Sequence, residues 1–102
     1  MARLVVMYKT PRDASAFDRH YVDTHVPLAK KMPGLRKYEV SRGAVGTPAG
    51  ASNYHLVAIL HFDDVPSIQA GVASPEGQAA VGDLQNFATG GADIFMFESR
   101  DV

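Results

Sequence analysis

Tyr21 and His25 are the two residues whose types and spacing point most clearly to chemistry. They stand four residues apart in a segment with the pattern of a helix, so both side chains lie on one face. Pro27 follows closely and has no amide hydrogen, so it leaves the carbonyl of Asp23 without its usual donor. An imidazole can transfer protons near neutral pH, and a phenol can donate a hydrogen bond to a carbonyl or enolate oxygen. We therefore predict His25 and Tyr21 as catalytic residues; the alternative is that His25 only caps free carbonyls near Pro27.

Other residue patterns offer less chemistry. His55 and His61 are six residues apart in an expected strand, which is roughly 20 Å and too far for one metal ion. On the expected alternation, both project from the same strand face. The chain has no cysteine, which excludes disulfides and thiolate metal sites, and it has no glycine-rich phosphate-binding motif. We expect neither a metal site nor a cofactor.

The element that must position Tyr21 and His25 is a helix that begins after Asp13 and ends at Pro33-Gly34. Asp13 is suited to cap it, because its carboxylate accepts bonds from the free amides of the first turn. Pro27 should kink or tighten this helix. Helical spacing predicts four inward-facing residues: Phe17, Tyr21, Thr24 and Leu28.

The rest of the chain alternates between strands and helices. Strands are expected at 4–8, 35–42, 54–62 and 94–98, with a flexible glycine-rich loop at 43–52. Asp64 is suited to cap a short helix, and Ser74-Pro75 to begin a second one that ends near residue 87. This order predicts one domain over residues 1–102 with the α+β class and a ferredoxin-like βαββαβ sandwich, in which both helices cover one face of a four-stranded antiparallel sheet.

The second sheet face should also be apolar. Residues 54–62 and 94–98 carry apolar side chains at both odd and even positions, for example Val57 and Ile59, or Phe95 and Phe97. A face left to water should be polar, so we expect a second copy to cover it and form a dimeric α/β barrel. The same topology can bind RNA, but the strand at 54–62 has no Arg or Lys and two aspartates follow it. We therefore expect a homodimer and no nucleic acid.

Composition adds few constraints. The net charge is −1, although nine of the ten Lys and Arg residues precede residue 43. This asymmetry allows a polyanion-binding surface, but we favour mixing of the two halves in the fold. No run approaches the roughly 20 apolar residues of a membrane helix, and the first residues do not form a secretory signal. We expect a cytoplasmic protein without a membrane partner.

Several motifs together resemble the EthD family of the dimeric α/β-barrel superfamily. The resemblance covers nearly the whole chain. It is carried by Phe17-x-x-x-Tyr21-x-x-x-His25-x-Pro27-Leu28, by Met32-Pro33-Gly34-Leu35, by the strand 54–62 with Asp63-Asp64, by Ser74-Pro75-Glu76 and by Asp83-Leu84-x-x-Phe87. Relatives often have an acidic residue and a tryptophan near positions 59 and 61, where this chain has Ile59 and His61.

The resemblance implies a homodimer with a ligand cleft between helices and sheet in each subunit, in which His25 matches the family's helix histidine. The founding member is tied to bacterial degradation of ethyl tert-butyl ether, and relatives act on polyketide-like aromatics, isomerise lactones or oxidise aromatic or haem substrates. We expect a cofactor-free isomerase or lyase for a small hydrophobic or aromatic carbonyl compound. A non-catalytic binding or accessory protein and an oxygen-using monooxygenase-like barrel stay open. Expected ligand contacts are Tyr8, Phe17, Leu28, Phe62 and Phe87, which otherwise form core.

Overall fold

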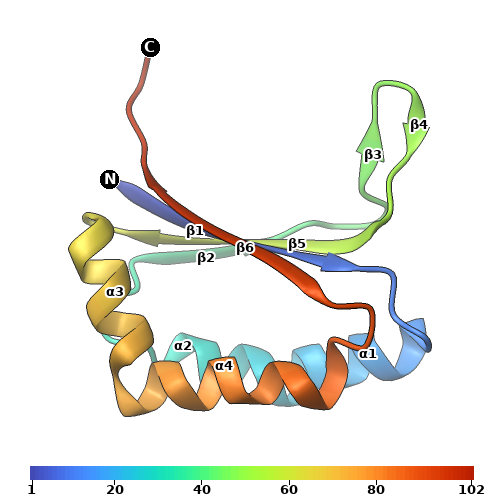
Figure 1. Cartoon of the computed structure of the whole chain (residues 1–102), viewed down its shortest axis with the longest axis horizontal. Helices are drawn as coiled ribbons and strands as arrows, with labels where there is room; N and C mark the ends of the chain where they lie inside the picture. The colour runs from blue at the N-terminus through green and yellow to red at the C-terminus, as the bar shows by residue number, and fades with distance from the viewer.

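Four strands form a single antiparallel sheet with helices on one side (Figure 1). The computed structural model describes all residues from 1 to 102. Its sheet has the order β2-β5-β1-β6, with β1 at Ala2–Lys9, β2 at Lys37–Val40, β5 at Tyr54–Phe62 and β6 at Ala92–Glu98. This order is that of a ferredoxin-like βαββαβ sandwich, so the predicted α+β fold is confirmed.

The first helical segment contains a π-helical turn. It consists of α1 (Ala14–His20), the π-helix η1 (Tyr21–His25) and α2 (Val26–Lys30), and the Asp13 carboxylate caps α1 by accepting a 3.0 Å bond from the Ala16 amide. In η1 the amide of Val26 donates to the carbonyl of Tyr21, five residues earlier. The extra residue widens the helix here, whereas we expected Pro27 to kink or tighten it.

The widened turn changes which residues face the sheet. Phe17 and Tyr21 are buried as predicted, but Thr24 is exposed and Leu28 only half-buried. His25 and Ala29 are the buried residues of the next two turns. The prediction for Thr24 was wrong because it assumed regular α-helical spacing through this segment.

A second pair of helices returns the chain to the sheet. Helix α3 (Val65–Ala73) and helix α4 (Pro75–Phe87) meet at a sharp corner (Figure 1). The predicted caps are confirmed: Asp64 accepts from the Ser67 amide at 2.8 Å, and Ser74 from the Gly77 amide at 3.0 Å. A Cβ atom on Gly77 would lie 2.1 Å from the carbonyl oxygen of Gly71, so glycine is needed where the two helices touch.

Two features of the segment from 43 to 62 differ from the predictions. The expected loop forms a small hairpin, β3 (Gly46–Thr47) and β4 (Gly50–Ala51), which projects on the side of the sheet opposite the helices (Figure 1). Strand β5 contains a bulge at His55: Tyr54 pairs with Lys9 and Leu56 pairs with Tyr8, so His55 is an extra residue without a partner in β1. His55 contacts Phe17 and Asp18 of α1. The prediction that His55 and His61 share one face of the strand was therefore wrong.

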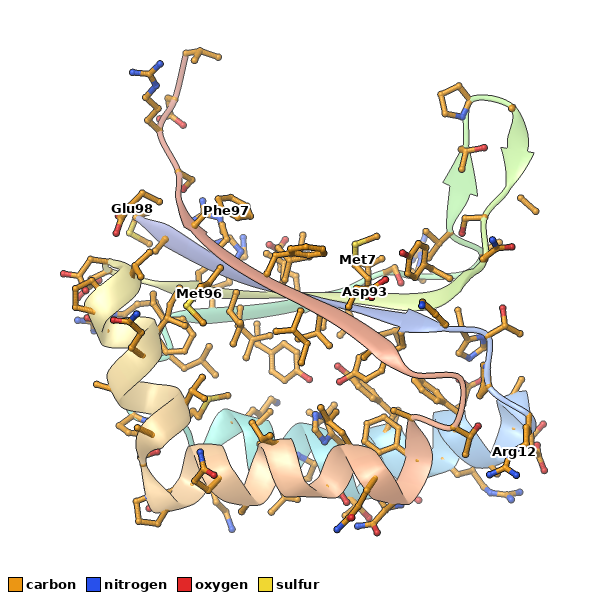
Figure 2. All side chains as sticks on the ribbon, viewed as in Figure 1. Met7, Arg12, Asp93, Met96, Phe97 and Glu98 are labelled. Atoms are coloured by element: carbon orange, nitrogen blue, oxygen red, sulfur yellow. The ribbon has the colours of Figure 1, made fainter.

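The two faces of the sheet differ in cover but not in polarity. The covered face supplies core residues such as Leu4, Val6, Leu60 and Phe62. The open face carries an apolar strip whose members are Val5, Met7, Val57, Ile59, Phe95 and Phe97. Figure 2 shows Met7 and Phe97 on the side away from the helices. No helix is both long and apolar enough to cross a lipid bilayer.

Candidate functional site

A cavity of about 240 Å³ lies between the sheet and the helices. Aliphatic side chains of β1 and β5 form its sheet side, and those of α2, α3 and α4 form its helix side. The residues concerned are Leu4, Val6, Ala58 and Leu60 from the sheet, and Ala29, Val72, Ala80 and Leu84 from the helices. Val81, Ile94 and Met96 also line the cavity and are each more than 40% exposed, so its mouth lies between α4 and β6.

Polar groups occur at one end of this cavity. Tyr8, His25 and Tyr38 line it there, from β1, η1 and β2 respectively. The cavity is thus an apolar chamber with hydrogen-bonding groups concentrated in one region. This composition suits a small ligand with a hydrophobic body and one oxygen-bearing group.

His25 is held by a carboxylate from α4. Its Nδ1 lies 3.0 Å from Oδ2 of Asp83, and both side chains are almost completely buried. An ionised carboxylate only accepts hydrogen bonds, so Nδ1 carries the proton and Nε2 keeps its lone pair. That Nε2 faces Tyr8, whose hydroxyl lies 3.4 Å away and donates weakly to it. Burial lowers the pKa of His25, so the imidazole is neutral at pH 7 and its free nitrogen can accept a proton.

Asp83 is buried on α4 but fully supplied with donors. His20 Nε2 lies 2.8 Å from Oδ1, and the Asn86 side-chain amide donates to the same oxygen at 3.0 Å. Burial alone would raise the pKa of Asp83, but the hydrogen bonds from Asn86, His20 and His25 outweigh it and hold the pKa below its ordinary value. The carboxylate therefore stays ionised beside His25 and can stabilise a positive charge on that ring.

The hydroxyl of Tyr21 does not reach the cavity directly. It lies 2.5 Å from the hydroxyl of Tyr38, which lines the cavity wall. Burial raises the pKa values of Tyr8, Tyr21 and Tyr38, so all three phenols are neutral. When Tyr21 donates to Tyr38, the proton of Tyr38 is free for a ligand oxygen.

The structure brings some of the predicted site residues together and separates others. His25 and Tyr8 line the cavity, whereas Tyr21 stands behind its wall. Phe17 and Phe87 pack around these rings, with Phe87 centred 4.8 Å from His25, but neither lines the cavity. Phe62 is fully buried core. Phe62 and Leu28 are also absent from the cavity lining. Phe62 lies beside the loop at Gly34. The π-helical turn rotates Leu28 around the helix axis, away from the face that contacts the sheet.

Sequence reasoning missed Asp83, Tyr38 and His20 as members of this cluster. In the sequence, Asp83 stands out only as part of the family motif Asp83-Leu84-x-x-Phe87. A physical signal was present, since Asp83 shares the inward helical face of Gly77, Ala80 and Phe87, where a lone carboxylate needs a buried partner. Tyr38 gave no such signal, because a tyrosine in a strand is common. No group of three or more His, Cys, Asp or Glu residues is arranged to hold a metal ion.

The sequence model of the EthD domain matches residues 9–91, which is most of the chain. The chain belongs to the EthD family. This confirms the predicted resemblance. An uncharacterized 11.0 kDa protein encoded in the thcB–thcC intergenic region of Rhodococcus erythropolis is 34% identical over 104 residues, which covers 100% of this chain and 98% of that protein.

Solved structures support the same assignment. An ethyl tert-butyl ether D (EthD) family protein from Bacillus halodurans C-125 is 38% identical, with a TM-score of 0.89 and coverage of 98% of this chain and 99% of that one. The fold is shared by more distant proteins. One is SnoaB, a cofactor-independent oxygenase from Streptomyces nogalater (16% identity, TM-score 0.68, 99% and 94% coverage). Another is a dimeric ferredoxin-like protein of unknown function from Thermobifida fusca YX (16%, 0.69, 94% and 88%).

Proposed function

We propose that this EthD-family protein is a cofactor-independent enzyme that moves a proton on a small hydrophobic or aromatic carbonyl compound. The observation that carries this proposal is the arrangement of His25: a buried, neutral imidazole with Nδ1 bound to Asp83 and Nε2 at the polar end of an apolar cavity. A neutral ring with a fixed tautomer is the form that a general base requires.

The proposed step begins at a carbon next to the carbonyl. His25 Nε2 accepts the proton of that C–H bond, and the electron pair moves onto the carbonyl oxygen as an enolate. The resulting imidazolium is stabilised by the Asp83 carboxylate, 3.0 Å from Nδ1. The Tyr38 hydroxyl donates to the enolate oxygen, and the Tyr21 hydroxyl donates to that of Tyr38. Tyr21 thus supports the donor, whereas the sequence predicted that Tyr21 itself would donate to the substrate. Return of the proton to another carbon gives an isomer, and loss of a leaving group gives an elimination product.

Hydrogen–deuterium exchange tests the step without knowledge of the natural substrate. A panel of aryl ketones that fit the cavity is incubated in D₂O, and NMR follows deuterium incorporation beside the carbonyl. We expect the wild type to accelerate exchange for at least one ketone, and His25→Gln to lose about 10²–10⁴-fold of this acceleration, the usual contribution of a general base. His61→Gln, which changes a histidine on the open face, is the matched control. Unchanged exchange in His25→Gln would remove His25 from the mechanism.

A binding or accessory function is the second candidate, and the aliphatic wall of the cavity favours it. Such a protein would hold its ligand without breaking a C–H bond. Saturable binding of the same ketones, followed by tyrosine fluorescence, together with no exchange in any of them, would favour this function. Oxygen uptake in the same reactions would instead favour oxygenase chemistry, the activity named for SnoaB.

We further infer that two copies pair through the open face of the sheet. Phe95 and Phe97 are 55% and 46% exposed there, and Val5 of β1 and Ile59 of β5 continue the apolar strip across the sheet. An uncovered apolar strip of this kind is typical of an interface. The Thermobifida fusca protein of the same fold is described as dimeric, which supports the pairing. Sedimentation equilibrium should give twice the 11.0 kDa mass of the chain.

A further inference from the structure

Two histidines share the carboxylate of Asp83. His25 approaches Oδ2 from the cavity side, and His20 approaches both oxygens, at 2.8 and 3.0 Å, from the other side. The two side chains differ in access to water: His20 is 28% exposed, whereas His25 is 7% and Asp83 5% exposed. The carboxylate therefore connects a buried ring in the cavity with a ring at the surface.

The chain fixes this arrangement through packing on one aromatic ring. His20 stacks on Phe87 with centroids 5.1 Å apart and an interplanar angle of 21°, and His25 contacts the same ring at 4.8 Å. Asn86, one turn after Asp83, donates to Oδ1. The carboxylate thus has three donors, from His20, His25 and Asn86, which restrict its rotation.

We propose that His20 is a positioning residue that holds Asp83 against His25 and, by competing for the same negative charge, links protonation of the cavity base to the solvent. Its catalytic meaning rests on the proposed function. When His20 is neutral, it is a hydrogen-bond donor and the charge of Asp83 is available to stabilise a cationic His25. When His20 gains a proton from water, it neutralises that charge and a second cation becomes unfavourable.

The surroundings contain few other charges that could produce this link. Tyr8 faces His25 from β1, and its burial raises its pKa and keeps it neutral. Tyr21 and Tyr38 are neutral for the same reason. Arg12 and Asp13 line the hollow beside His20 and have opposite charges. The charge of His20 is among the causes that lower the pKa of His25, after burial, which agrees with the proposal.

Long-range ¹H–¹⁵N NMR of the histidine rings tests the link in the free protein. His20→Gln keeps an amide donor near the position of Nε2 but cannot titrate. We expect its His25 signals to match the wild type at high pH, and the protonated fraction of His25 to become about threefold to tenfold higher than in the wild type on acidification, because like charges across one site repel. His61→Gln, whose partner is Glu39 on the open face, should leave the His25 titration unchanged.

A second variant separates position from charge. His20→Leu removes the donor as well, so we expect the Nδ1–H tautomer of His25 to lose population even near pH 8, with the fold checked by near-ultraviolet circular dichroism. Coincident His25 titrations in the wild type and His20→Gln would overturn the proposed link. These measurements need no substrate, so a failure of ketone exchange would disprove the proposed function and leave this result intact.

Discussion

The two faces of the sheet show how similar apolar patterns can serve different purposes. On the covered face, apolar residues of β1 and β5 pack against helices and leave a chamber with His25, Tyr8 and Tyr38 at one end. On the open face, Phe95 and Phe97 of β6 are apolar as well but are 55% and 46% exposed. The covered face thus stabilises the single chain and, under the proposed function, holds the ligand, whereas the open face is the one we propose a second copy to cover.

The largest expected effect comes from a matched pair of phenylalanines on the two faces. Phe62→Ala should lower the unfolding free energy by about 3–5 kcal/mol, because Phe62 is completely buried. Phe97→Ala should cost a folded single chain less than about 1 kcal/mol but raise the dimer dissociation constant at least tenfold. Urea denaturation and sedimentation measure these two quantities. If both variants lost the same unfolding free energy and Phe97→Ala kept the sedimentation mass of the wild type, the two faces would not differ in the way described.

Removing the charge that supports His25 is expected to act on the covered face alone. Asp83→Asn keeps the size of the side chain but can turn its amide nitrogen toward His25 and so favour the wrong tautomer. Ketone exchange should fall about 100-fold or more, and the buried cluster should lose about 1–3 kcal/mol of unfolding free energy. The exposed carboxylate of Asp18, which pairs with His55, offers a control variant, Asp18→Asn, that should alter neither.

The pH dependence of stability should show the same cluster. The folded pKa of His25 is lowered, so the unfolded chain binds its proton more readily and stability falls as the pH drops below about 6.5. The folded pKa of Asp83 is also lowered; its contribution is complete above about pH 4 and is lost on further acidification. Urea titrations of the wild type and His25→Gln should therefore diverge just below pH 6.5. Parallel curves through that range would show that His25 titrates alike in both states.

The smallest effect is expected at the hydroxyl of Tyr21, which bonds to Tyr38 and does not line the cavity itself. Tyr21→Phe keeps the ring packed on Phe17 and removes the hydroxyl that is bonded to Tyr38. Ketone exchange should slow by about threefold to tenfold, because the hydrogen bond from Tyr21 to Tyr38 is worth about 1 kcal/mol. Tyr38→Phe should slow it further, because this hydroxyl lines the cavity. A reversed order of the two variants would place the ligand oxygen near Tyr21.

The sequence was enough to predict the order of the helices and strands and the two apolar faces of the sheet, but little of the cluster around Asp83. Alternation in residues 54–62, helix caps at Asp13 and Ser74, and proline and glycine at helix ends are local signals, and they led to the correct element order. Asp83 meets His25 across 58 positions of the chain, and no local pattern reports such a contact. The bulge at His55 and the hairpin at 46–51 depend on strand pairing, which alternation alone cannot fix.

Because of the π-helical turn, the direction in which the His25 side chain points depends on the number of residues in the helix as well as on their types. Four residues advance a regular α-helix by about 40° beyond a full turn, so Ala29 would lie about 120° around the axis from Phe17. The wider turn cancels much of that drift and lets Phe17, Tyr21, His25 and Ala29 face the sheet together. Deleting one exposed residue there, such as Val22, would leave every named side chain present while rotating the imidazole away from its carboxylate. A family member that keeps these letters but lacks the inserted residue would therefore have a differently aimed histidine.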